Sequence, residues 1–255
     1  MIKFALVGLA GFVAKKHVKC IKDLGGELIA AMDYHDNVGF IDSFFPNCIF
    51  FKKENEFFSF LEKKKINYVV VCSPSHLHFK HIKQSLIAKC NVIVEKPPIL
   101  NSKNYLKILK LEKIYKKKCY CIFQLRLDKK LKNLKRKILY DTKMNNVEVI
   151  YYTFRGDWYF KSWKNIKLFS GGLLVNIAIH FFDILIWIFG NVKKIKILNQ
   201  KNSEVRGYLE LDKAKVKWIV SINKNKKKEL KTRKKFYRIM RVNKKLINFD
   251  KFDDL

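Results

Sequence analysis

The sequence predicts an α/β protein in which a doubly wound parallel sheet is followed by an α+β domain with an open, mostly antiparallel sheet. In residues 1–127, short continuous apolar runs alternate with segments of helical spacing, which is typical of parallel strands buried on both faces. After about residue 140, apolar and polar residues alternate with period two, which favours strands with one buried face. The chain has 255 residues, of which 49% are hydrophobic. It is therefore long enough for two domains, predicted over 1–127 and 128–255.

The first domain is predicted to alternate strands and helices along the chain. Apolar runs rich in β-branched residues predict the strands, and apolar residues three and four positions apart predict the helices. The predicted strands are Lys3–Leu9, Glu27–Asp33, Cys48–Phe51, Asn67–Cys72, Val92–Glu95 and Cys119–Leu127. The predicted helices are Ala14–Leu24, Asn55–Lys64, His78–Ala88 and Tyr105–Tyr115. This order is that of a parallel sheet with helices on both faces.

The second domain is predicted from segments that alternate with period two and from one long apolar helix. The alternating segments are Val147–Arg155, Arg206–Leu211, Val216–Ile222 and Phe236–Val242. The helix is predicted over Leu173–Phe189. Because it contains Asn176, His180 and Asp183, it is too polar for a membrane span and is expected to be buried in the protein. We expect no membrane partner.

Basic residues far outnumber acidic ones. Lys and Arg number 54 and Asp and Glu 22, which gives a formal net charge of +32. Such a charge attracts polyanions, but the lysines are spread over almost every segment, and arginine, which reads guanine with two hydrogen bonds, is scarce. We interpret the charge as lysine on solvated faces, encoded by an AT-rich genome, and expect no specific nucleic-acid partner. The densest basic run, residues 224–235, is predicted to be a solvated loop.

The cysteines and the N-terminus indicate the compartment. The 6 cysteines form no C-x-x-C pair and mostly lie in apolar runs, where free cysteine behaves as a small hydrophobic residue. The sequence therefore predicts neither a disulfide framework nor a metal site. The N-terminus lacks the small-residue cleavage pattern of a signal peptide. We expect a reducing, cytoplasmic location.

The first predicted strand runs into the loop Gly8-Leu9-Ala10-Gly11-Phe12-Val13-Ala14. Small residues at this point allow a tight turn and the close approach of the backbone to a pyrophosphate, as in the dinucleotide-binding Rossmann fold. Ala10 replaces the second glycine of G-x-G-x-x-G, so the loop alone is weak evidence. Asp33 ends the second predicted strand, where an acidic residue accepts hydrogen bonds from ribose hydroxyls and disfavours a 2′-phosphate. We predict NAD as the cofactor, and a strand-end cap is the alternative role for Asp33.

Two further groups of residues carry chemistry. Glu95-Lys96-Pro97-Pro98 follows the fifth predicted strand, at the sheet edge where open α/β sheets bind ligands. Lys96 is therefore placed to face a substrate, although a single lysine in so basic a chain is ordinarily a surface residue. Asn176, His180 and Asp183 have the spacing of neighbours on one helix face. This polar stripe is either a satisfied hydrogen-bond network in the core or part of a site.

Four motifs together resemble those of the Gfo/Idh/MocA oxidoreductases. They are the Gly8–Ala14 loop, Ser73-Pro74-Ser75-His76-Leu77-His78, Glu95-Lys96-Pro97, and Gly171-Gly172 followed by His180 and Asp183. Within that family the chain is similar to the bacterial UDP-N-acetylglucosaminuronic acid 3-dehydrogenases of lipopolysaccharide O-antigen synthesis. The narrower likeness is carried by Gln124-Leu125-Arg126, by the run Arg155–Lys164, and by Asn176, where the wider family usually has Asp.

The resemblance implies a Rossmann domain followed by an open antiparallel sheet, tightly held NAD, and removal of a hydride from C3 of the uronate in a UDP-sugar. It implies Lys96 and His180 as the catalytic pair. One would take the hydroxyl proton and the other would stabilise the alkoxide, in an assignment that the sequence leaves open. The implied cofactor-binding residues are Gly8, Ala10, Gly11, Phe12, Val13, Asp33, Ser73, His78, Glu95, Lys96 and Gln124. The implied substrate-binding residues are Lys96, Arg155, Tyr159, Trp163, Asn176 and His180.

The resemblance also implies a homo-oligomer, a tetramer in this branch, formed through the open sheets, with 2-oxoglutarate as an oxidant for NADH. Members of the family generally continue beyond the position of Leu255 with a helical segment, so we expect a shortened chain. Ala178 stands where many relatives have Gly. The alternatives are another sugar or polyol dehydrogenase of the family, an inactive nucleotide-binding relic, and a polyanion-binding protein. Retention of Asp33, Glu95, Lys96 and His180 argues against a relic.

Overall fold

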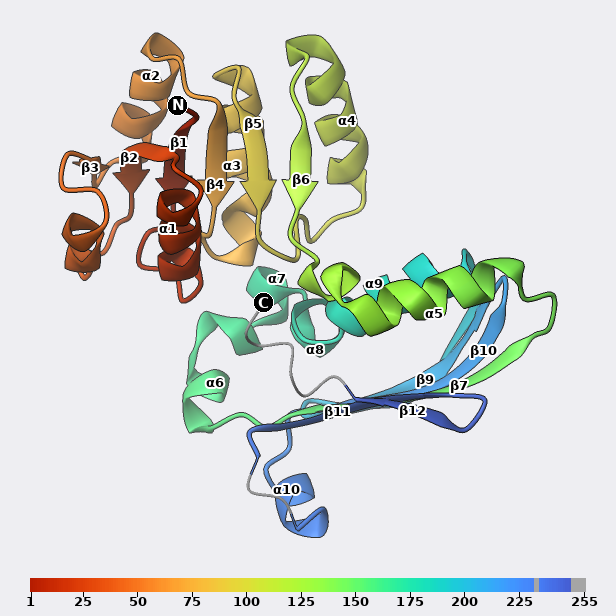
Figure 1. Cartoon of the computed structure of the whole chain (residues 1–255). Coiled ribbons are helices and arrows are strands. Elements are labelled where there is room, and N and C mark those ends of the chain that lie inside the picture. Colours follow the sequence, from red (N-terminus) through yellow and green to blue (C-terminus); the bar gives the residue numbers. More distant parts are fainter. Residues whose placement is uncertain (232–233, 249–255) are drawn as a thin grey trace. The chain divides into compact units, whose positions relative to one another are not determined.

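The computed structural model describes residues 1–231 and 234–248. The chain divides into two compact units, Met1–Ile122 and Phe123–Leu255 (Figure 1). The segment Phe123–Leu127, which the sequence analysis assigned to the first domain, belongs to the second unit. Two parts of that analysis, residues 232–233 of the basic run and the C-terminal residues 249–255, lie outside the described residues.

The first unit is built on a 6-stranded sheet in which all neighbours are parallel. Its strands are β1 (Lys3–Val7), β2 (Glu27–Met32), β3 (Ile49–Phe51), β4 (Tyr68–Val71), β5 (Asn91–Val94) and β6 (Cys119–Cys121). They lie side by side in the order β3-β2-β1-β4-β5-β6. The strands are short apolar runs because helices cover both faces of the sheet. The structure confirms the doubly wound parallel sheet.

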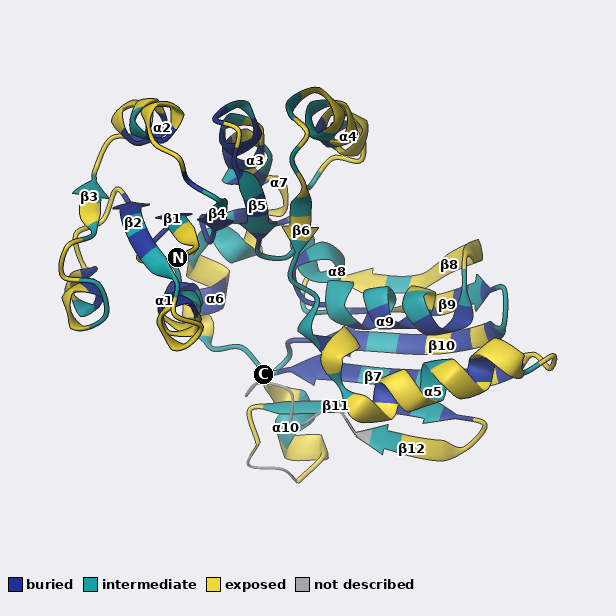
Figure 2. Cartoon of the chain, turned by 45° about the horizontal axis from the view of Figure 1, so that its top comes forward, coloured by how far each residue is buried: buried dark blue, intermediate teal, exposed yellow. Residues whose placement is uncertain are grey.

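Helices cover the sheet of the first unit on both faces (Figures 1 and 2). They are α1 (Ala14–Asp23), η1 (Gly39–Ser43), α2 (Glu54–Lys63), η2 (Ser75–Leu77), α3 (His78–Ile87) and α4 (Lys103–Tyr115). Alternate residues of β1 enter separate buried clusters. Leu6 packs with Val18 of α1 on one face, and Val7 packs with Phe57 of α2 on the other. The period of two along the strand thus divides the core of this unit into two layers.

The second unit contains a 6-stranded sheet that is mostly antiparallel. Its strands are β7 (Asn145–Thr153), β8 (Val192–Lys201), β9 (Glu204–Leu211), β10 (Ala214–Ser221), β11 (Phe236–Val242) and β12 (Lys245–Asn248). The order is β12-β11-β7-β10-β9-β8, and only β7 and β10 are parallel neighbours among the described strands. Burial alternates along β9 and β10 because one face is packed and the other is open. The predicted open sheet is confirmed.

Helices of the second unit cover one face of its sheet (Figure 1). The helical segments are η3 (Gln124–Leu127), α5 (Lys129–Tyr140), α6 (Asp157–Lys161), η4 (Trp163–Asn165), α7 (Lys167–Ser170), α8 (Gly172–Asn176), α9 (Ile179–Phe189) and α10 (Asn225–Glu229). Leu131 of α5 and Phe181 of α9 share a single buried cluster with Trp218 of β10. Part of the basic run that was predicted to be a loop forms α10 instead. No residue of α10 is buried.

The prediction of one continuous helix over Leu173–Phe189 is wrong. The chain forms α8 and α9 instead, and the axis turns by 49° between Lys167–Asn176 and Ile179–Phe189. At the break, the amide N–H groups of Ile177 and Ala178 both bond to the carbonyl oxygen of Leu173, at 3.0 and 3.2 Å, so the regular ladder ends. Asn176 therefore closes one helix, and His180 and Asp183 lie on the next.

The prediction of a strand over Cys119–Leu127 is also wrong beyond Cys121. The apolar run serves two separate cores. Cys119 and Cys121 pack against the core of the first unit, and Leu125, on η3, is buried in the core of the second. The sequence period does not reveal this change of core, because both parts of the run are apolar.

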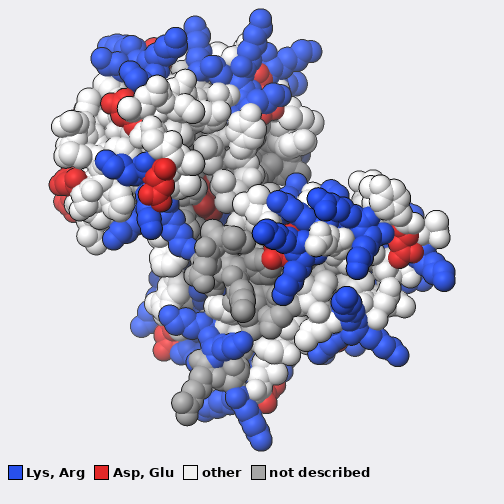
Figure 3. All heavy atoms as spheres, in the orientation of Figure 1, with Lys and Arg blue, Asp and Glu red and all other residues white. Residues whose placement is uncertain are grey.

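Two long elements, α5 and β8, are missing from the sequence prediction because lysine dominates both. In α5 only Leu131 and Ile138 are buried, and no residue of β8 is buried. Lysines and arginines are spread over the drawn face of each unit rather than gathered on one element (Figure 3). No single described helix is long and apolar enough to cross a membrane, and α7–α8 with α9 reach that length only as a bent pair.

Candidate functional site

The loop after β1 is pressed against the end of β4. Gly8 has a φ of +89°, and a Cβ atom on it would lie 2.3 Å from the backbone nitrogen of Ser73. A Cβ on Gly11 would lie 2.6 Å from the carbonyl oxygen of Cys72. Only glycine fits at these two positions, so the glycines are what allow the loop to turn tightly against the end of β4.

The carboxylate after β2 holds this loop. Asp33 is 8% exposed, and its Oδ2 accepts a hydrogen bond of 2.8 Å from the backbone N–H of Ala10. Its Oδ1 accepts from the N–H of His35 at 2.9 Å. Val13 immediately precedes α1, and Phe12 is 91% exposed. The structure therefore brings together the first strand end, the acidic residue of the second, and a helix N-terminus, which is an arrangement that suits a dinucleotide.

The Glu95-Lys96-Pro97 segment follows β5 at the same edge of the sheet. The Glu95 carboxylate pairs with Nε2 of His17 from α1 at 2.8 Å, and both side chains are largely shielded from solvent. Lys96 is half-buried. His17 was not a candidate from the sequence, since the two partners are 78 residues apart.

His78 is fully buried, and each of its ring nitrogens lies within hydrogen-bond distance of a backbone carbonyl oxygen, to one of which the neutral ring donates. Its Nδ1 lies 2.7 Å from the carbonyl oxygen of Pro97, and its Nε2 lies 2.7 Å from the carbonyl oxygen of Ser73. Burial lowers the pKa of the His78 imidazole, against the raising effect of these two carbonyls. The ring joins the β4 end to the Glu95–Pro97 segment, so His78 supports the residues at the edge of the sheet.

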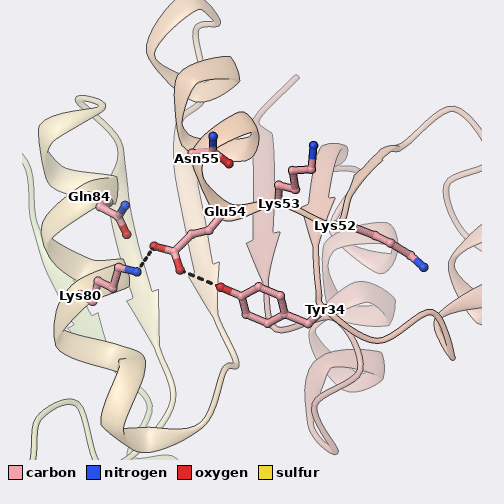
Figure 4. Close-up of a pocket in the computed structure, with 7 residues that line it drawn as sticks. All are labelled: Tyr34, Lys52, Lys53, Glu54, Asn55, Lys80 and Gln84. Atoms are coloured by element: carbon pink, nitrogen blue, oxygen red, sulfur yellow. Dashed lines mark hydrogen bonds and ion pairs between the residues drawn. The ribbon is translucent and has the colours of Figure 1, made fainter.

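A polar pocket of about 540 Å³ lies between α2 and α3 (Figure 4). Glu54 reaches from α2 toward Lys80 of α3. The Nζ of Lys80 lies 2.7 Å from the Oε1 of Glu54. The Tyr34 hydroxyl donates to the Glu54 Oε2 at 3.1 Å. None of these three residues was a candidate from the sequence. Among the described residues, no group of three or more His, Cys, Asp or Glu side chains is arranged to hold a metal ion.

In the second unit, Arg155, Tyr159 and Asn176 come together from three segments. Tyr159 on α6 is buried, and its hydroxyl hydrogen-bonds with Asn176 at the end of α8. Burial raises the pKa of Tyr159, while the positive charge of Arg155 and the bond to Asn176 oppose the rise. A guanidinium, a phenol and an amide in one place suit the oxygens of a polar anionic ligand.

Two tryptophans extend this cluster. The Arg155 guanidinium lies 5.9 Å from the centre of the Trp158 ring, and the Lys164 ammonium lies 5.3 Å from the same ring and 5.8 Å from Trp163. Burial and the nearby charge of Arg155 lower the pKa of Lys164. Lys164 was not among the candidate site residues, and its only sequence signal was its place in the Arg155–Lys164 run. Two cations held this close favour an anionic ligand.

His180 and Gln124 belong to neighbouring segments of the second unit. The guanidinium of Arg126, on η3, binds both carboxylate oxygens of Asp183, with an Nε–Oδ2 distance of 2.8 Å. Asp183 lies one turn after His180 on α9. The paired charges therefore fasten the segment that carries Gln124 to the helix that carries His180.

The fold and the glycine loop together define a dinucleotide-binding protein with a second α/β unit, in which cationic and polar side chains gather around Arg155 and Tyr159. Residues 2–123 match the model of the oxidoreductase family with the NAD-binding Rossmann fold, Gfo/Idh/MocA, and residues 132–228 match the model of its C-terminal alpha/beta domain. The chain belongs to the Gfo/Idh/MocA oxidoreductase family, and its cofactor is NAD. The tight turn at Gly8 and Gly11, directly before the N-terminus of α1, and the carboxylate of Asp33 fit that dinucleotide.

Solved structures of similar proteins extend the comparison. The chain is 37% identical to the WlbA (WbpB) dehydrogenase from Thermus thermophilus, solved with NAD and alpha-ketoglutarate. The alignment covers 98% of this chain and 83% of that one, with a TM-score of 0.94. The WlbA (WbpB) structure from the same organism with NAD and UDP-GlcNAcA gives 36% identity over 99% and 85% of the two chains and a TM-score of 0.95.

A curated relative matches over a shorter stretch. The chain is 30% identical over 142 residues to a putative oxidoreductase, YteT, from Bacillus subtilis. The match covers 54% of this chain and only 33% of the relative's length.

Proposed function

We propose that this protein oxidises the C3 hydroxyl of UDP-N-acetylglucosaminuronic acid with NAD and yields the 3-keto sugar nucleotide. The observation that carries the proposal is the likeness to the WlbA (WbpB) dehydrogenase bound to NAD and UDP-GlcNAcA, at 36% identity over 99% of this chain. The cluster of Arg155, Tyr159 and Asn176 supports it, since a uronate and a diphosphate are both anionic. The reaction serves O-antigen sugar synthesis in the cytoplasm.

The first unit holds the cofactor in this proposal. Its backbone loop from Gly8 to Val13 and the α1 N-terminus receive the pyrophosphate, and Asp33 accepts from the adenosine ribose. Ser73, Glu95 and Gln124 contribute further polar contacts, and His78 contributes through the carbonyls that it holds. Bound NAD supplies the hydride acceptor.

Lys96 and His180 handle the proton of the reacting alcohol. Loss of a hydride from carbon requires loss of the hydroxyl proton to a positioned base, a role that the imidazole of His180 can fill. The Lys96 ammonium stabilises the negative charge that develops on the oxygen. Arg155, Tyr159, Trp163 and Asn176 orient the uronate and the diphosphate.

The proposal includes a second small molecule and self-association. We propose 2-oxoglutarate as the oxidant that regenerates NAD, on the likeness to the Thermus structure with alpha-ketoglutarate. We propose a tetramer formed through the open sheet of the second unit. Its support is the exposed apolar side chains of β8, such as Ile195 at 55% and Leu198 at 47%. Light scattering coupled to size exclusion measures that state.

The test follows NADH by its near-ultraviolet absorbance in purified protein with NAD and UDP-N-acetylglucosaminuronic acid, with and without 2-oxoglutarate. Lys96→Ala and His180→Ala should each lower kcat by about 10²–10⁴-fold, the range for loss of a proton-transfer group. Lys103→Ala, an exposed lysine at the start of α4, is the matched control and should keep full activity.

The outcomes separate the levels of the proposal. Turnover that both variants lose supports the substrate and the catalytic pair. A folded protein that binds NAD but reduces it only with another sugar or polyol contradicts the substrate assignment and keeps the dehydrogenase. A folded protein that binds NAD but oxidises none of these substrates contradicts the proposal that the protein is a dehydrogenase.

A further inference from the structure

Three side chains form a buried hydrogen-bonded line behind the end of β4. The Ser73 hydroxyl lies 2.8 Å from Nδ1 of His81, and the His81 Nε2 lies 3.5 Å from Oε2 of Glu54. The three residues are 8%, 1% and 9% exposed, in that order along the line. They come from the β4 end, α3 and the start of α2. The line therefore runs from the candidate cofactor edge to the pocket of Figure 4.

Glu54 is held as a carboxylate at the outer end of the line. Burial raises the pKa of its carboxyl, but the hydrogen bond from Lys80, the neighbouring His81 ring, the hydrogen bond from Tyr34 and the charge of Lys80 together bring the pKa below its ordinary value. Figure 4 shows the carboxylate between the Lys80 ammonium and the Tyr34 hydroxyl. A fixed negative charge therefore faces the His81 ring.

His81 is neutral at physiological pH, and its surroundings select one tautomer. Burial lowers the pKa of the ring to about 4, against the raising effect of Glu54, and the nearby His78 and Lys80 lower it further. A neutral imidazole carries one proton. On Nε2 that proton points at the Glu54 carboxylate, whereas on Nδ1 it would leave a lone pair against a negative oxygen. The proton therefore stays on Nε2, and Nδ1 accepts.

We propose that Glu54 is a positioning residue that acts through His81 to fix the Ser73 hydroxyl as a pure hydrogen-bond acceptor for the dinucleotide. Ser73 gives its only hydroxyl proton to Nδ1 of His81, so toward a ligand it offers lone pairs alone. Ser73 lies against Gly8, where a Cβ would come within 2.6 Å of the Ser73 Cα. The Ser73 hydroxyl oxygen would therefore accept a hydrogen bond from a donor on the cofactor. That donor is either a hydroxyl of the ADP-ribose part or the amide of the nicotinamide.

This inference rests on the proposed function for its ligand, but its first test does not. In protein labelled with ¹⁵N histidine, long-range ¹⁵N–¹H spectra distinguish a protonated ring nitrogen from an unprotonated one. The full chain without cofactor should show His81 with Nε2 protonated and Nδ1 unprotonated. A proton on Nδ1 overturns the proposal, whatever the variants below do.

The second test is a binding cycle with NAD and with ADP-ribose, followed by calorimetry. Ser73→Ala should weaken NAD binding about three- to tenfold, the range for one net hydrogen bond. Glu54→Met, which keeps the volume but removes the acceptor, should weaken it about threefold in the unmodified chain. In the Ser73→Ala background, Glu54→Met should have no further effect, because the two changes remove the same interaction.

Two further variants sharpen the cycle. Glu54→Gln keeps an oxygen acceptor and should retain more affinity than Glu54→Met. Glu56→Met is the matched control, since Glu56 is exposed on the same helix and pairs with Lys53 at 3.0 Å. It should leave both affinities unchanged.

The ligand arms locate the donor and separate the two proposals. A loss seen with ADP-ribose as well as NAD places the donor in the ADP-ribose part, and a loss with NAD alone places it on the nicotinamide amide. If Glu54→Met weakens NAD binding equally in the unmodified chain and in the Ser73→Ala variant, Glu54 does not act through Ser73. That result overturns this proposal and leaves the proposed function intact. An unmodified protein that binds neither ligand overturns the proposed function and, with it, the ligand of Ser73.

Discussion

The two units of the chain build their cores in different ways. In the first, the described residues form two buried clusters, one on each face of the parallel sheet. In the second, a single cluster lies between α5, α9 and one face of the sheet, and the other face carries exposed side chains such as Tyr208 and Arg206. Figure 2 shows that β8, at the edge of the second sheet, is exposed along most of its length, whereas the central strands β7 and β10 are largely buried.

The difference follows from how the strands are connected. Parallel neighbours need long crossovers, whose helices must lie on the faces of the sheet. Antiparallel neighbours such as β9 and β10 are joined by a tight turn, so nothing forces a helix onto the second face. The first unit therefore has its chemistry at strand ends, and the second carries its candidate residues on the helices and on the segments between them.

The largest expected effect tests the claim that the second unit depends on one packed face. Trp218 is 1% exposed and packs against Phe181 and Phe182. Trp218→Ala should destabilise the second unit by about 3–5 kcal/mol, the usual cost of removing a large buried aromatic. Chemical denaturation followed by circular dichroism measures the loss.

Tyr208→Ala is the control on the open face, with Tyr208 46% exposed. At protein concentrations where the chain is a monomer, it should cost less than about 0.5 kcal/mol, as a surface substitution does. A larger cost that disappears on dilution would support the proposed tetramer, because a second copy of the chain would then cover this face, whereas a larger cost that persists on dilution would break the contrast.

The next effect concerns acid stability of the first unit. Burial lowers the pKa of His81 in the folded chain to about 4, below its ordinary value of 6.5. Above pH 6.5 both the folded and the unfolded chain carry a neutral His81, so its contribution to stability is complete. As the pH falls from 6.5 to 4, only the unfolded chain takes up the proton, and stability falls by on the order of 3 kcal/mol.

Denaturation curves across this pH range check the effect. His81→Gln should flatten the pH dependence between 6.5 and 4, since it removes one group that the unfolded chain protonates. His78, whose pKa burial also lowers, should keep part of the slope in that variant. A curve for His81→Gln that overlays the original would contradict the buried neutral state of His81.

A smaller effect tests the strand-end packing at Gly8. Gly8→Ala should destabilise the first unit by about 2–3 kcal/mol, because the added Cβ meets the backbone of Ser73 and the positive φ is unfavourable for alanine. Gly25→Ala is the matched control, with a φ of +68° and nothing within 4 Å of the added atom. It should cost about 1 kcal/mol, the strain alone. Equal costs at the two glycines would show that the close approach to Ser73 is absent.

The same contrast explains which site residues were predictable from sequence. Gly8, Asp33 and Lys96 follow strands of the parallel sheet, and the end of a buried apolar run marks the edge of the sheet directly. Asn176 and His180 were placed on one helix because no glycine or proline marks the break at Ile177. That break depends on tertiary packing. The 3.6-residue spacing of apolar side chains, from which the helix was predicted, does not reveal it.

The missed residues share a different cause. His17 with Glu95, and His81 with Glu54, are partners separated by 78 and 27 residues. The sequence around each of these residues does not indicate its partner. The partners come together only in the folded unit, where α1, α2 and α3 pack around the sheet. In the same way α5 has too few apolar residues to be recognised, although Leu131 and Ile138 anchor it to the core.

The smallest effect compares two ion pairs within the second unit. The side chain of Asp183 is 8% exposed and accepts hydrogen bonds from Nε and Nη2 of Arg126. Glu148 pairs with Arg241 on the sheet, and both of those side chains are well exposed. Asp183→Asn should cost about 1–2 kcal/mol, toward the low end for charged hydrogen bonds because Arg126 itself is 43% exposed. Glu148→Gln should cost less than about 0.5 kcal/mol.

Salt separates the two pairs further, because exposed charges are screened and shielded ones are not. Adding salt to high concentration should abolish the small effect of Glu148→Gln and leave most of the effect of Asp183→Asn. Asp183→Asn should also lower kcat more than it raises KM. The reason is that the pair of Asp183 with Arg126 links the segment that contains Gln124 to the helix that carries His180. If Asp183→Asn changes stability and leaves kcat untouched, the ion pair is structural only, and the candidate residues of the second unit are held by the packed face alone.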